Sequence, residues 1–475
     1  MGQKITIEPV TRVEGHGKIT IHLGADGEVE DARLHINEFR GFEKFCEGRM
    51  FFEMPNITQR ACGICPVSHH IAASKACDQI VGVQPTVTGR KLRELLHMGQ
   101  IVQSHSLHFF HLASPDLLLG FDSDPATRNV FGLINADPNL ALMAVRLRKF
   151  GQEVIKKVAG RRIHPYGSVS GGVNDALTPT ERDEILGEVD SVIAGIRSGV
   201  DIIRGYAEQN KELFDTFGAN EAGYMGLVND RGGLEMYDGK IRIKDNQGNI
   251  VVNRHDPADY LSIIGEKVEK WSYMKFPFYL PWGYPRGVYR VGPCGRLAVA
   301  DHIDTPLANE EFERYRDMTN GGLAKGALYY HYARMIENLY AAERIKELCS
   351  DPSICDTDVV ATMNSHYNRE GIGVIEAPRG TLIHHMIVSP DGKVEKLNMI
   401  VATGNNNWAI NASVKQVAMA YVKGKEIKEG MLNRVEAAVR CYDPCLSCAT
   451  HAMGQMPLVV ELVDADGRMV DRIAR

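Results

Sequence analysis

The chain has 475 residues, of which 44% are hydrophobic and 24% are charged. These proportions are typical of a globular protein, and they exclude a disordered chain, a collagen-like chain and a small scaffold that depends on disulfides. With 54 Lys and Arg against 60 Asp and Glu, the formal net charge is −6. So mild a charge argues against nucleic acid or a membrane surface as the main partner.

The N-terminal segment, MGQKITIEPVTRVEGHG, contains no apolar stretch of the kind that a signal peptide requires. Further along, the sequence has no apolar run of about 18 to 20 residues, which is the length that crosses a bilayer. We therefore expect a cytoplasmic protein without a membrane span. Because thiols stay reduced in the cytoplasm, paired cysteines favour catalysis or metal binding over disulfides.

The expected elements begin with a β-hairpin. Within residues 4–37, apolar and polar side chains alternate on both sides of the turn Gly24–Gly27. A period of 3.6 over about 67–157 and again over about 178–216 predicts helices. The second helical region starts with Thr178-Pro179-Thr180-Glu181, which has the residue types of a capping box.

The second half of the chain mixes both element types. We expect a small β excursion at about 220–262, a helix at about 321–349, strands at 373–377, 381–388 and 393–403, and helices near 411–424 and 430–441. No repeat, low-complexity tract or linker divides the sequence. The predicted fold class is α+β, mainly α: one domain over residues 1–451, with a large helical core built as a bundle of long helices, peripheral β-hairpins and small sheets.

Two CxxC pairs, Cys62/Cys65 and Cys445/Cys448, lie near opposite ends of the chain. Four thiolates suit zinc, an iron–sulfur cluster, or nickel or iron in a sulfur environment. One pair alone fits a redox dithiol or half of a structural zinc site equally well, but zinc ribbons place their pairs only about 15 to 20 residues apart. The wide separation means that the whole fold must close the site, which favours a buried catalytic centre.

The sequence around both pairs resembles a known family. Residues 60–69 read RACGICPVSH and residues 443–451 read DPCLSCATH. These segments are similar to the two signature motifs of the large subunit of [NiFe]-hydrogenases, RxCGxCxxxH and DPCxxCxxH. Further matching segments occur in order along the chain, at residues 12–16 (RVEGH), 39–43 (FRGFE), 104–116 and 376–380 (EAPRG). The resemblance therefore covers nearly the whole chain and implies the fold of that subunit.

The resemblance implies that Cys62, Cys65, Cys445 and Cys448 hold nickel, with Cys65 and Cys448 also bridging to an iron that carries CN and CO ligands. It implies reversible heterolytic cleavage of H2, a reaction that needs a base for the proton. By family analogy Cys445 is the first proton acceptor and Glu14 relays the proton outward. Taken alone, Glu14 is better explained as a surface carboxylate in a strand–loop segment, and the RVEGH match reverses that preference.

Around the open metal position, Pro378 and Arg379 resemble the family's proline and arginine, and Asp116 and Asp443 resemble the carboxylate neighbours of that arginine. A guanidinium keeps its charge and can polarise a substrate, and a structural Arg–Asp pair is compatible with that role.

Five histidines are expected to stay off the metal. We expect His69 and His384 to make hydrogen bonds around the site instead of binding the metal. His105, His108 and His111 recur every third residue, and we expect them to meet carbonyls or carboxylates.

A second metal site follows from the same resemblance. Glu43 and His451 match ligands of magnesium or another divalent cation, with the backbone carbonyl at Ile400 as a third ligand. Oxygen-rich coordination suits such a hard ion. The segment after Ile400 reads VATGNNN and departs from the family pattern, which leaves open the groups that hydrogen-bond the CN and CO ligands.

Within the family, residues 42–49, 65–70 and 128–134 resemble the cytoplasmic NAD-reducing, bidirectional hydrogenases. The segment Gly371–Glu376 (GIGVIE) is an incomplete GxGxxG without its third glycine. We therefore expect NAD, FMN and iron–sulfur clusters on partners, namely a small subunit with an Fe–S cluster and diaphorase subunits that bind FMN and NAD.

Three other functions remain open at this stage. The first is a hydrogenase that serves another carrier, either a deazaflavin or a heterodisulfide reductase. The second is a structural zinc protein that uses the same four cysteines. The third is a respiratory quinone-reductase subunit, which the presence of all four cysteines disfavours.

In the family, the large subunit is made in a precursor form with a C-terminal extension. Maturation chaperones insert the metals, and a dedicated endopeptidase cuts after the histidine of DPCxxCxxH. Residues 452–475 follow that histidine in this sequence, so the resemblance predicts a precursor. We expect an uncleaved form whose Cys445/Cys448 arm is displaced, and a strand within Met456–Val463.

Overall fold

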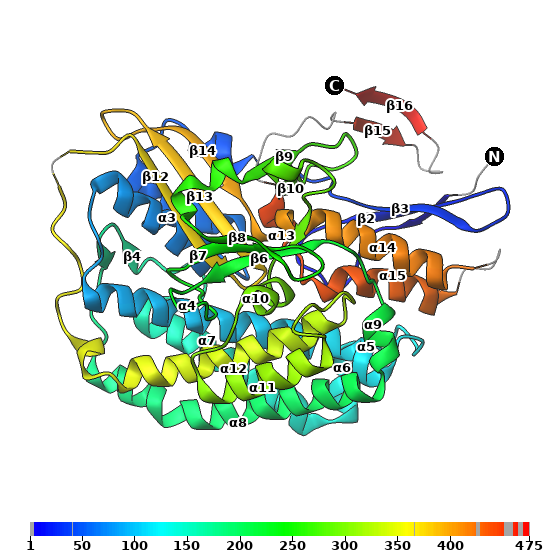
Figure 1. Cartoon of the computed structure of the whole chain (residues 1–475), viewed down its shortest axis with the longest axis horizontal. Helices are drawn as coiled ribbons and strands as arrows, with labels where there is room; N and C mark the ends of the chain where they lie inside the picture. The colour runs from blue at the N-terminus through cyan, green and yellow to red at the C-terminus, as the bar shows by residue number, and fades with distance from the viewer. Residues whose placement is uncertain are drawn as a thin grey trace.

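The computed structural model describes residues 4–39, 41–364, 366–423 and 428–450, together with two strands near the C-terminus, β15 (Val459–Val463) and β16 (Met469–Ala474). Long helices form the lower part of the molecule in Figure 1, and small sheets lie above them. The arrangement is mainly helical with peripheral β elements. It confirms the predicted fold class.

The helical bundle is built on α12 (Tyr329–Ser350), which packs against α4 (Val87–Leu107), α8 (Pro179–Gln209) and α11 (Pro306–Met318), while α4 also packs along α7 (Pro138–Ala159). The predicted capping box of α8 is present: the Glu181 amide donates to Thr178 Oγ1, and the Thr178 amide donates to Glu181 Oε2. α12 begins later than expected, because Gly321 and Gly322 have φ of 79° and 93°, outside the helical range.

Shorter elements complete the helical part. The region predicted as helix over 67–157 also contains α3 (Pro66–Val81), the π-helix η3 (His108–Ala113), α5 (Ser114–Leu119) and α6 (Val130–Ala136). The remaining α-helices are α1 (Phe42–Cys46), α2 (Met54–Thr58), α9 (Lys211–Thr216), α10 (Pro293–Val299), α13 (Ala402–Asn405), α14 (Asn407–Tyr421), α15 (Glu429–Cys441) and α16 (Leu446–Ala449). The 3-10 turns are η1 (Phe51–Glu53), η2 (Gln59–Ala61), η4 (Pro257–Ser262), η5 (Leu280–Trp282) and η6 (Pro352–Cys355).

The predicted N-terminal hairpin is β2 (Lys18–Leu23) and β3 (Val29–His35), and β1 (Lys4–Ile7) adds a third antiparallel strand. The β excursion forms β6 (Gly223–Val228), β7 (Lys240–Lys244) and β8 (Ile250–His255), and the parallel strand β11 (Tyr289–Arg290) extends this sheet. The described residues also contain the strand pairs β4 (Ser168–Val169) with β5 (Gly172–Val173), and β9 (Ile264–Lys267) with β10 (Phe276–Tyr279).

A third sheet lies in the interior. It has the order β12 (Glu370–Ala377), β13 (Gly380–Val388) and β14 (Val394–Ile400), and α3 packs on β12 and β13. A Cβ on Gly373 would lie 1.8 Å from the Ala72 carbonyl oxygen of α3. The glycines of the incomplete GxGxxG therefore serve close strand–helix packing, and this segment is a strand interior.

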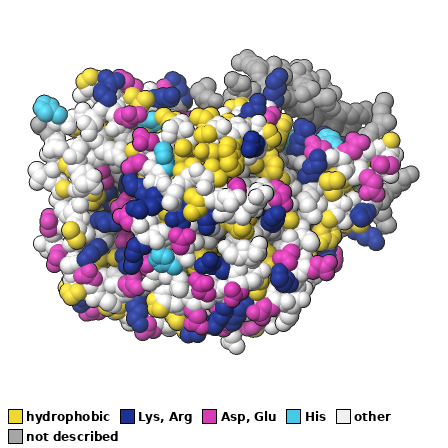
Figure 2. All heavy atoms as spheres, viewed as in Figure 1, with side chains coloured by type: hydrophobic (Ala, Val, Ile, Leu, Met, Phe, Trp, Pro, Cys, Tyr) yellow, Lys and Arg dark blue, Asp and Glu magenta, His cyan; other side chains and the backbone are white. Residues whose placement is uncertain are grey.

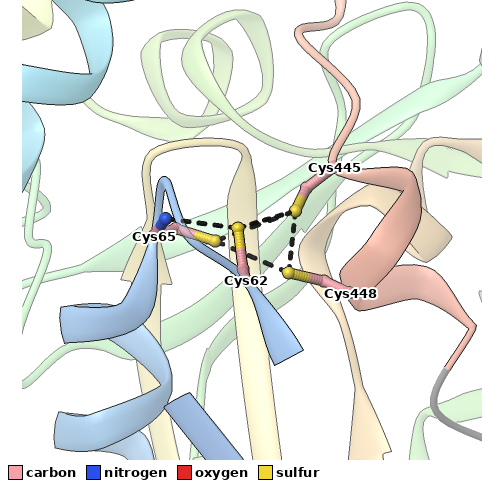
Figure 3. A group of neighbouring side chains, drawn as sticks. All are labelled: Cys62, Cys65, Cys445 and Cys448. Carbon is pink, nitrogen blue, oxygen red and sulfur yellow. Dashed lines mark hydrogen bonds between the residues drawn. The ribbon is translucent and has the colours of Figure 1, made fainter. Parts of the chain in front are cut away.

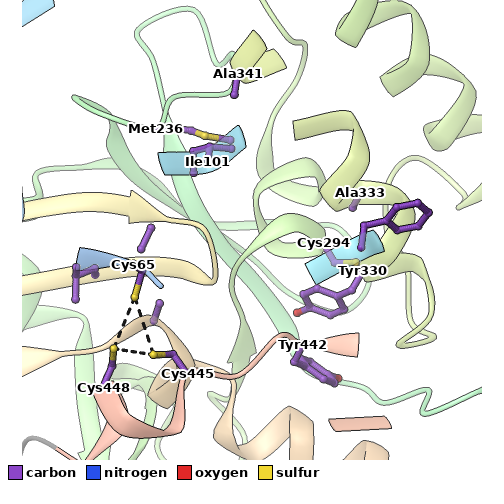
Figure 4. Close-up of a cluster of buried hydrophobic side chains, with 14 of the residues drawn as sticks. Cys65, Ile101, Met236, Cys294, Tyr330, Ala333, Ala341, Tyr442, Cys445 and Cys448 are labelled. Carbon is purple, nitrogen blue, oxygen red and sulfur yellow. Dashed lines mark hydrogen bonds between the residues drawn. The ribbon is translucent and has the colours of Figure 1, made fainter. Parts of the chain in front are cut away.

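The main hydrophobic core includes residues from Ile5 on β1 to Ala449 on α16, so it joins the N-terminal strands to the second cysteine pair. Figure 4 shows Cys65, Cys445 and Cys448 inside this core, with Tyr330 and Tyr442 close by. The rings of Tyr330 and Tyr442 have centroids 4.5 Å apart. Charges within so apolar an environment interact strongly, because little water screens them.

The surface seen in Figure 2 carries Lys and Arg interspersed with Asp and Glu, and hydrophobic side chains gather in its upper middle. Neither sign dominates this face, in keeping with the net charge of −6. None of the described helices combines the length and the apolar composition that a bilayer crossing requires.

Candidate metal centre

The four cysteines of the two CxxC pairs meet at one buried point (Figure 3). Cys62 Sγ lies 3.1 Å from Cys445 Sγ, Cys65 Sγ lies 3.7 Å from Cys448 Sγ, and all four sulfurs lie within 4.8 Å of one another. In a four-coordinate thiolate site, metal–sulfur distances of about 2.3 Å place the sulfurs roughly 3.8 Å apart. The donor set therefore fits a soft or borderline metal.

Local hydrogen bonds shape the first pair. Cys62 follows η2, and its Sγ accepts hydrogen bonds from the amides of Ile64 and Cys65. The side chains of Gln100 and Gln103 on α4 both donate to the Ile64 carbonyl oxygen, at 2.7 and 2.6 Å. α3 then begins with Pro66 directly after Cys65. Both thiols of the pair are thus presented from a turn fixed at each end.

The second pair is anchored into the core. The Cys445 amide donates to Thr403 Oγ1 at 2.9 Å, and Cys448 lies one turn later in α16. The expectation that the arm bearing Cys445 and Cys448 is displaced is wrong for this structure, because these contacts hold it against the first pair. The expected strand is present as β15, whereas residues 456–458 lie outside the described part of the chain.

The surroundings shift the pKa of Cys62 in the opposite direction from those of Cys445 and Cys448. Burial by itself raises the pKa of Cys62, but hydrogen bonds from the neighbouring thiols and the charge of Arg379 outweigh burial and hold the pKa well below its ordinary value. Burial raises the pKa of Cys445 and Cys448 well above theirs, and hydrogen bonding with Cys62 and Cys65 adds to this rise. A cation that binds here replaces these protons.

Arg379 lies beside the cysteines, in the lining of a small cavity that Pro378, Thr403 and His69 share with Cys65, Cys445 and Cys448. Its Nε donates to the Asp443 carbonyl oxygen, and its Nη2 lies 3.0 Å from Asp443 Oδ1. Burial raises the pKa of Asp443, although Arg379 opposes this rise. The structure thus brings together Pro378, Arg379 and Asp443, as the sequence predicted.

Glu14 touches the second cysteine arm through its backbone and its side chain. The Leu446 amide donates to the Glu14 carbonyl oxygen at 3.1 Å, and the Ser447 amide donates to Glu14 Oε2 at 3.0 Å. Glu14 and Cys445 also form an isolated parallel β-bridge. The side chain is half-buried, so it lies between the buried sulfurs and the surface.

Asp116 lies elsewhere. Its carboxylate accepts hydrogen bonds from Arg12, from Arg440 at 2.8 Å and from Asn433 at 3.0 Å. Burial raises the pKa of Asp116, but the charges of Arg440 and Arg12 hold it below its ordinary value. Asp116 is absent from the lining of the cavity beside the cysteines. These contacts place it in a separate cluster that anchors the segment before Glu14, and not beside Arg379.

The histidines behave largely as expected. His69 Nδ1 lies 3.0 Å from His384 Nε2. On α4 and the π-helix, His105 contacts the Glu337 carboxylate at 3.0 Å and His108 contacts the Arg440 carbonyl oxygen at 2.7 Å. Among the described residues, the only group of three or more Cys, His, Asp or Glu side chains placed to hold a metal is the four-cysteine cluster.

Two of the three proposed ligands of the second cation lie near each other. Glu43 Oε1 accepts a hydrogen bond from the Met399 amide at 2.7 Å, and Ile400 is the next residue along β14. His451 lies outside the described residues.

The sequence did not point to Gln100, Gln103 or Thr403, which hold the two cysteine arms. These residues act through single hydrogen bonds across the fold, and such bonds leave no spacing pattern in the sequence. The only feature of the sequence that drew attention to the segment containing Thr403 was its departure from the family pattern after Ile400.

Comparisons with known proteins point to one family. The family described as nickel-dependent hydrogenase matches residues 40–122 and 221–451, and a family described as HoxL-like matches residues 4–39. The beta subunit of the NAD-reducing hydrogenase HoxS of Cupriavidus necator is 46% identical over 489 aligned positions that cover 100% of both chains. A second relative, from the F420-non-reducing hydrogenase of Methanothermobacter thermautotrophicus, is 42% identical over 99% of this chain and 100% of its own.

Solved structures agree. The crystal structure of an NAD+-reducing [NiFe]-hydrogenase in the H2-reduced state superposes with a TM-score of 0.92 at 46% identity, covering 94% of this chain and 99% of that one. A [NiFeSe]-hydrogenase of Dm. baculatum shares the fold, with a TM-score of 0.76 at 24% identity and coverage of 95% and 100%. Membership of a nickel-dependent family disfavours the structural zinc protein and the quinone-reductase subunit. The chain belongs to the nickel-dependent hydrogenase family, as a large subunit of the [NiFe] type.

Proposed function

We propose that this chain is the catalytic subunit of a hydrogenase that cleaves H2 reversibly and heterolytically and passes the electrons through partner subunits to NAD. The observation that carries the proposal is the convergence of four buried cysteine sulfurs, from both ends of the chain, within 4.8 Å. The identity of 46% over the full length to a subunit named for NAD reduction supports the choice of NAD.

We assign nickel to Cys62, Cys65, Cys445 and Cys448, and we assign an iron with CN and CO ligands to the side of Cys65 and Cys448. When bound, these metals supply a redox centre at which the H–H bond is broken. Pro378, Arg379 and Thr403 line the cavity next to Cys65 and Cys448, so these residues are the proposed surroundings of the CN and CO ligands.

The protein's own part in the reaction is to take up the proton. Cys445 is the proposed first acceptor, and Glu14 is the proposed relay. Glu14 suits this role because the Ser447 amide fixes its carboxylate two residues from Cys445. A relay needs such fixed geometry, since proton transfer requires hydrogen-bond contact.

Arg379 is proposed to orient the substrate beside the sulfurs. Its guanidinium is held by Asp443 and remains charged. Asp116 has a different proposed role, because it contacts Arg12 and Arg440. We propose that Asp116 positions the segment that carries Glu14.

The second cation, magnesium or another divalent ion, is proposed to bind Glu43, the Ile400 carbonyl oxygen and His451. The contact between Glu43 and the Met399 amide supports this assignment, because it brings the first ligand next to Ile400. A hard cation of this type suits a carboxylate and a carbonyl.

We propose that residues 1–451 form a single domain and that residues 452–475 are removed during maturation by an endopeptidase, with the help of chaperones. The family match that ends at residue 451 supports this boundary. The proposed partners are a small subunit with an Fe–S cluster and diaphorase subunits that bind FMN and NAD, working in the cytoplasm where NAD is held.

The test is hydrogen-dependent reduction of NAD and of a viologen dye by the complex, co-expressed with its partners and assayed together with its nickel content. We expect both acceptors to be reduced, and Cys65→Ser to lose nickel and both activities. Cys77→Ser is the matched control, because Cys77 is a buried thiol on α3, the helix that begins directly after Cys65, and it donates to the Phe51 carbonyl oxygen.

The outcomes separate the alternatives. Activity retained in Cys65→Ser would contradict the metal assignment. Dye reduction without NAD reduction would favour another carrier, in line with the 42% identity to a chain of an F420-non-reducing hydrogenase.

A further inference from the structure

We propose that Arg296 is a positioning residue for hydrogen cleavage, because it fixes the hairpin tip from which Arg379 reaches the metal centre. The proposal rests on the proposed function, in which Arg379 orients the substrate. Arg296 lies on α10, in a part of the chain that no sequence motif singled out.

Arg379 sits at a very short turn. β12 and β13 pair up to Ala377 and Gly380, which leaves only Pro378 and Arg379 as the tip of the hairpin. From this tip the Arg379 side chain reaches Asp443, two residues before Cys445. The direction of the side chain therefore depends on the backbone of two residues.

Arg296 holds that backbone. Its Nη1 donates to the Ala377 carbonyl oxygen at 2.8 Å, and its Nη2 donates to the Pro378 carbonyl oxygen at 3.1 Å. The two carbonyls directly before Arg379 are thus tied to one rigid, planar group. Such a fork limits rotation of both peptide units, which a single hydrogen bond cannot do.

The guanidinium is itself fixed by two carboxylates. Its Nε and Nη2 donate to Glu337 on α12, both at 2.6 Å, and its Nη1 donates to Glu376 on β12 at 2.7 Å. All five N–H donors of Arg296 are therefore used. Arg296, Glu337 and Glu376 are each fully buried, so no water can replace a lost partner without a change in packing.

The carboxylates are fixed in turn. Glu376 Oε1 accepts hydrogen bonds from Thr381 Oγ1 and from the Leu227 amide, and Glu337 Oε2 contacts His105 on α4. The chain of contacts runs from the helical bundle, through Arg296, to the hairpin tip. A buried network of this kind specifies one arrangement only when every member is satisfied, as Arg296 is here.

The test replaces Arg296 by lysine in the co-expressed complex. Lysine keeps the charge but has no planar fork, so we expect nickel content to be retained while backbone deuterium exchange rises across residues 376–382. We expect hydrogen-dependent dye reduction per nickel to fall roughly 10- to 100-fold, the scale of a small displacement of a positioned group.

Arg93→Lys is the matched control. Arg93 is also fully buried, pairs with both oxygens of Asp78 and donates to two backbone carbonyls, those of Val169 and Gly172. These partners lie away from the hairpin tip, so their loss should not change exchange across 376–382. Equal exchange at the tip in Arg296→Lys and in the unmodified complex would overturn the proposal, and so would an equal rise in both variants.

A second variant, Glu337→Gln, covers the case in which Arg296→Lys does not fold. The amide removes one of the two hydrogen bonds that Glu337 accepts from Arg296 but keeps the shape of the side chain. Raised exchange at the tip supports the proposal, and unchanged exchange contradicts it. Deuterium exchange at the hairpin tip does not depend on activity. A failure of the proposed function would appear as an unmodified complex that lacks nickel and does not oxidise hydrogen. A failure of the present proposal would instead appear as unchanged exchange in the variants, so the two failures can be told apart.

Discussion

At the scale of single residues, the charge of Glu14 can be removed by mutation without losing the contacts that hold the residue in place. Its backbone carbonyl oxygen accepts a hydrogen bond from the Leu446 amide, and its carboxylate accepts one from the Ser447 amide. A glutamine at this position keeps an acceptor oxygen for the Ser447 amide and loses only the ability to carry a proton.

We expect Glu14→Gln to lower hydrogen-dependent dye reduction by about 100-fold or more, the usual contribution of a positioned acid or base. Nickel content should not change, because the cysteines are untouched. The control is Glu8→Gln, an exposed carboxylate of the same segment that pairs with Lys18. Full activity in Glu14→Gln would show that protons leave by another route.

The contacts of His70 predict that the folded protein loses stability in acid. The Ser168 amide donates to its Nε2, and its Nδ1 lies 2.8 Å from the Pro55 carbonyl oxygen, a pair of contacts that only the neutral ring can make. Burial lowers the pKa of His70 from 6.5 to about 4. The unfolded chain therefore binds an extra proton between these values, so stability falls as the pH falls from 6.5 towards 4.

For this one group the loss reaches about 1.4 kcal/mol per pH unit inside that window. We expect His70→Gln to flatten the pH dependence of the urea midpoint between pH 6.5 and 4, because the amide offers both an N–H donor and a carbonyl acceptor and does not titrate. His22→Gln, at an exposed position, should leave the slope as it is. An unchanged slope in His70→Gln would contradict the assignment.

At the scale of elements, the segment from Thr11 to Gly15 is held between α5, α15 and α16. Arg440 on α15 donates to the Thr11 carbonyl oxygen, and Arg12 contacts Asp116 on α5. On the other side, Gly15 lies against α16. These contacts set the register of the N-terminal segment against the second cysteine pair.

Gly15→Ala tests that close approach. A Cβ on Gly15, where φ is +80°, would lie 2.8 Å from the Ser447 amide nitrogen and 2.9 Å from Leu446 Cβ. Gly27→Ala is the matched control, because φ is +84° there and no atom lies within 4 Å. Both variants carry the strain of a left-handed backbone, about 1 kcal/mol. We expect only Gly15→Ala to lose nickel content. Equal nickel content in both variants would show that the close approach of Gly15 to α16 does not position the second cysteine pair.

Asp116→Asn tests whether Asp116 positions the segment or takes part in the reaction. Removing its charge leaves Arg12 and Arg440 close together without their shared carboxylate, so we expect a loss of roughly 3 kcal/mol in unfolding free energy. Dye reduction per bound nickel should fall less than in Glu14→Gln, because Glu14 keeps its own hydrogen bond from the Ser447 amide. Asp122→Asn, at an exposed carboxylate that pairs with Arg434, is the control. A fall in activity per nickel as large as that of Glu14→Gln, without a loss of unfolding free energy, would mean that Asp116 takes part in the reaction itself.

At the scale of the whole molecule, the metal centre joins segments separated by 383 positions, those of Cys62 and Cys445. A metal that binds the folded chain and not the unfolded one raises stability by mass action, by about 4 kcal/mol when its concentration is a thousand times its dissociation constant. The melting temperature of the nickel-loaded complex should therefore exceed that of the metal-free complex. In Cys448→Ser this difference should disappear, and its persistence would place the stabilising metal elsewhere.

The sequence predicted α4, α7, α8 and most of α12 from their helical period, and it predicted the start of α8 to the residue through its capping box at Thr178. The predicted region ran on to about residue 216, whereas α8 ends at Gln209 and the short α9 follows. The prediction missed α11, because helix was expected to resume only at about residue 321. It did not predict α10, β9 or β10, which are too short to show a period and depend on contacts with distant segments. It placed the start of α12 too early, where Gly321 and Gly322 leave the helical range.

For the candidate site, the motifs identified the cysteines, Glu14, Arg379 and Asp443, since spacing and neighbouring residues mark them. The motifs did not separate Asp116 from Arg379, because a motif gives an order along the chain and not a distance. Arg296 carried no signal at all, because its function lies in hydrogen bonds to Glu337 and to the backbone of the hairpin tip, which are distant in the sequence.

The placement of the two cysteine pairs also has a consequence for synthesis. A ribosome makes Cys62 and Cys65 first and makes Cys445 and Cys448 some 380 residues later, so the nascent chain holds half a site while the residues between them are translated. A chain released before residue 445 has no second pair and cannot close the centre. Completion of the four-cysteine site therefore requires that translation has passed residue 448, and a shorter chain lacks two of the four thiols.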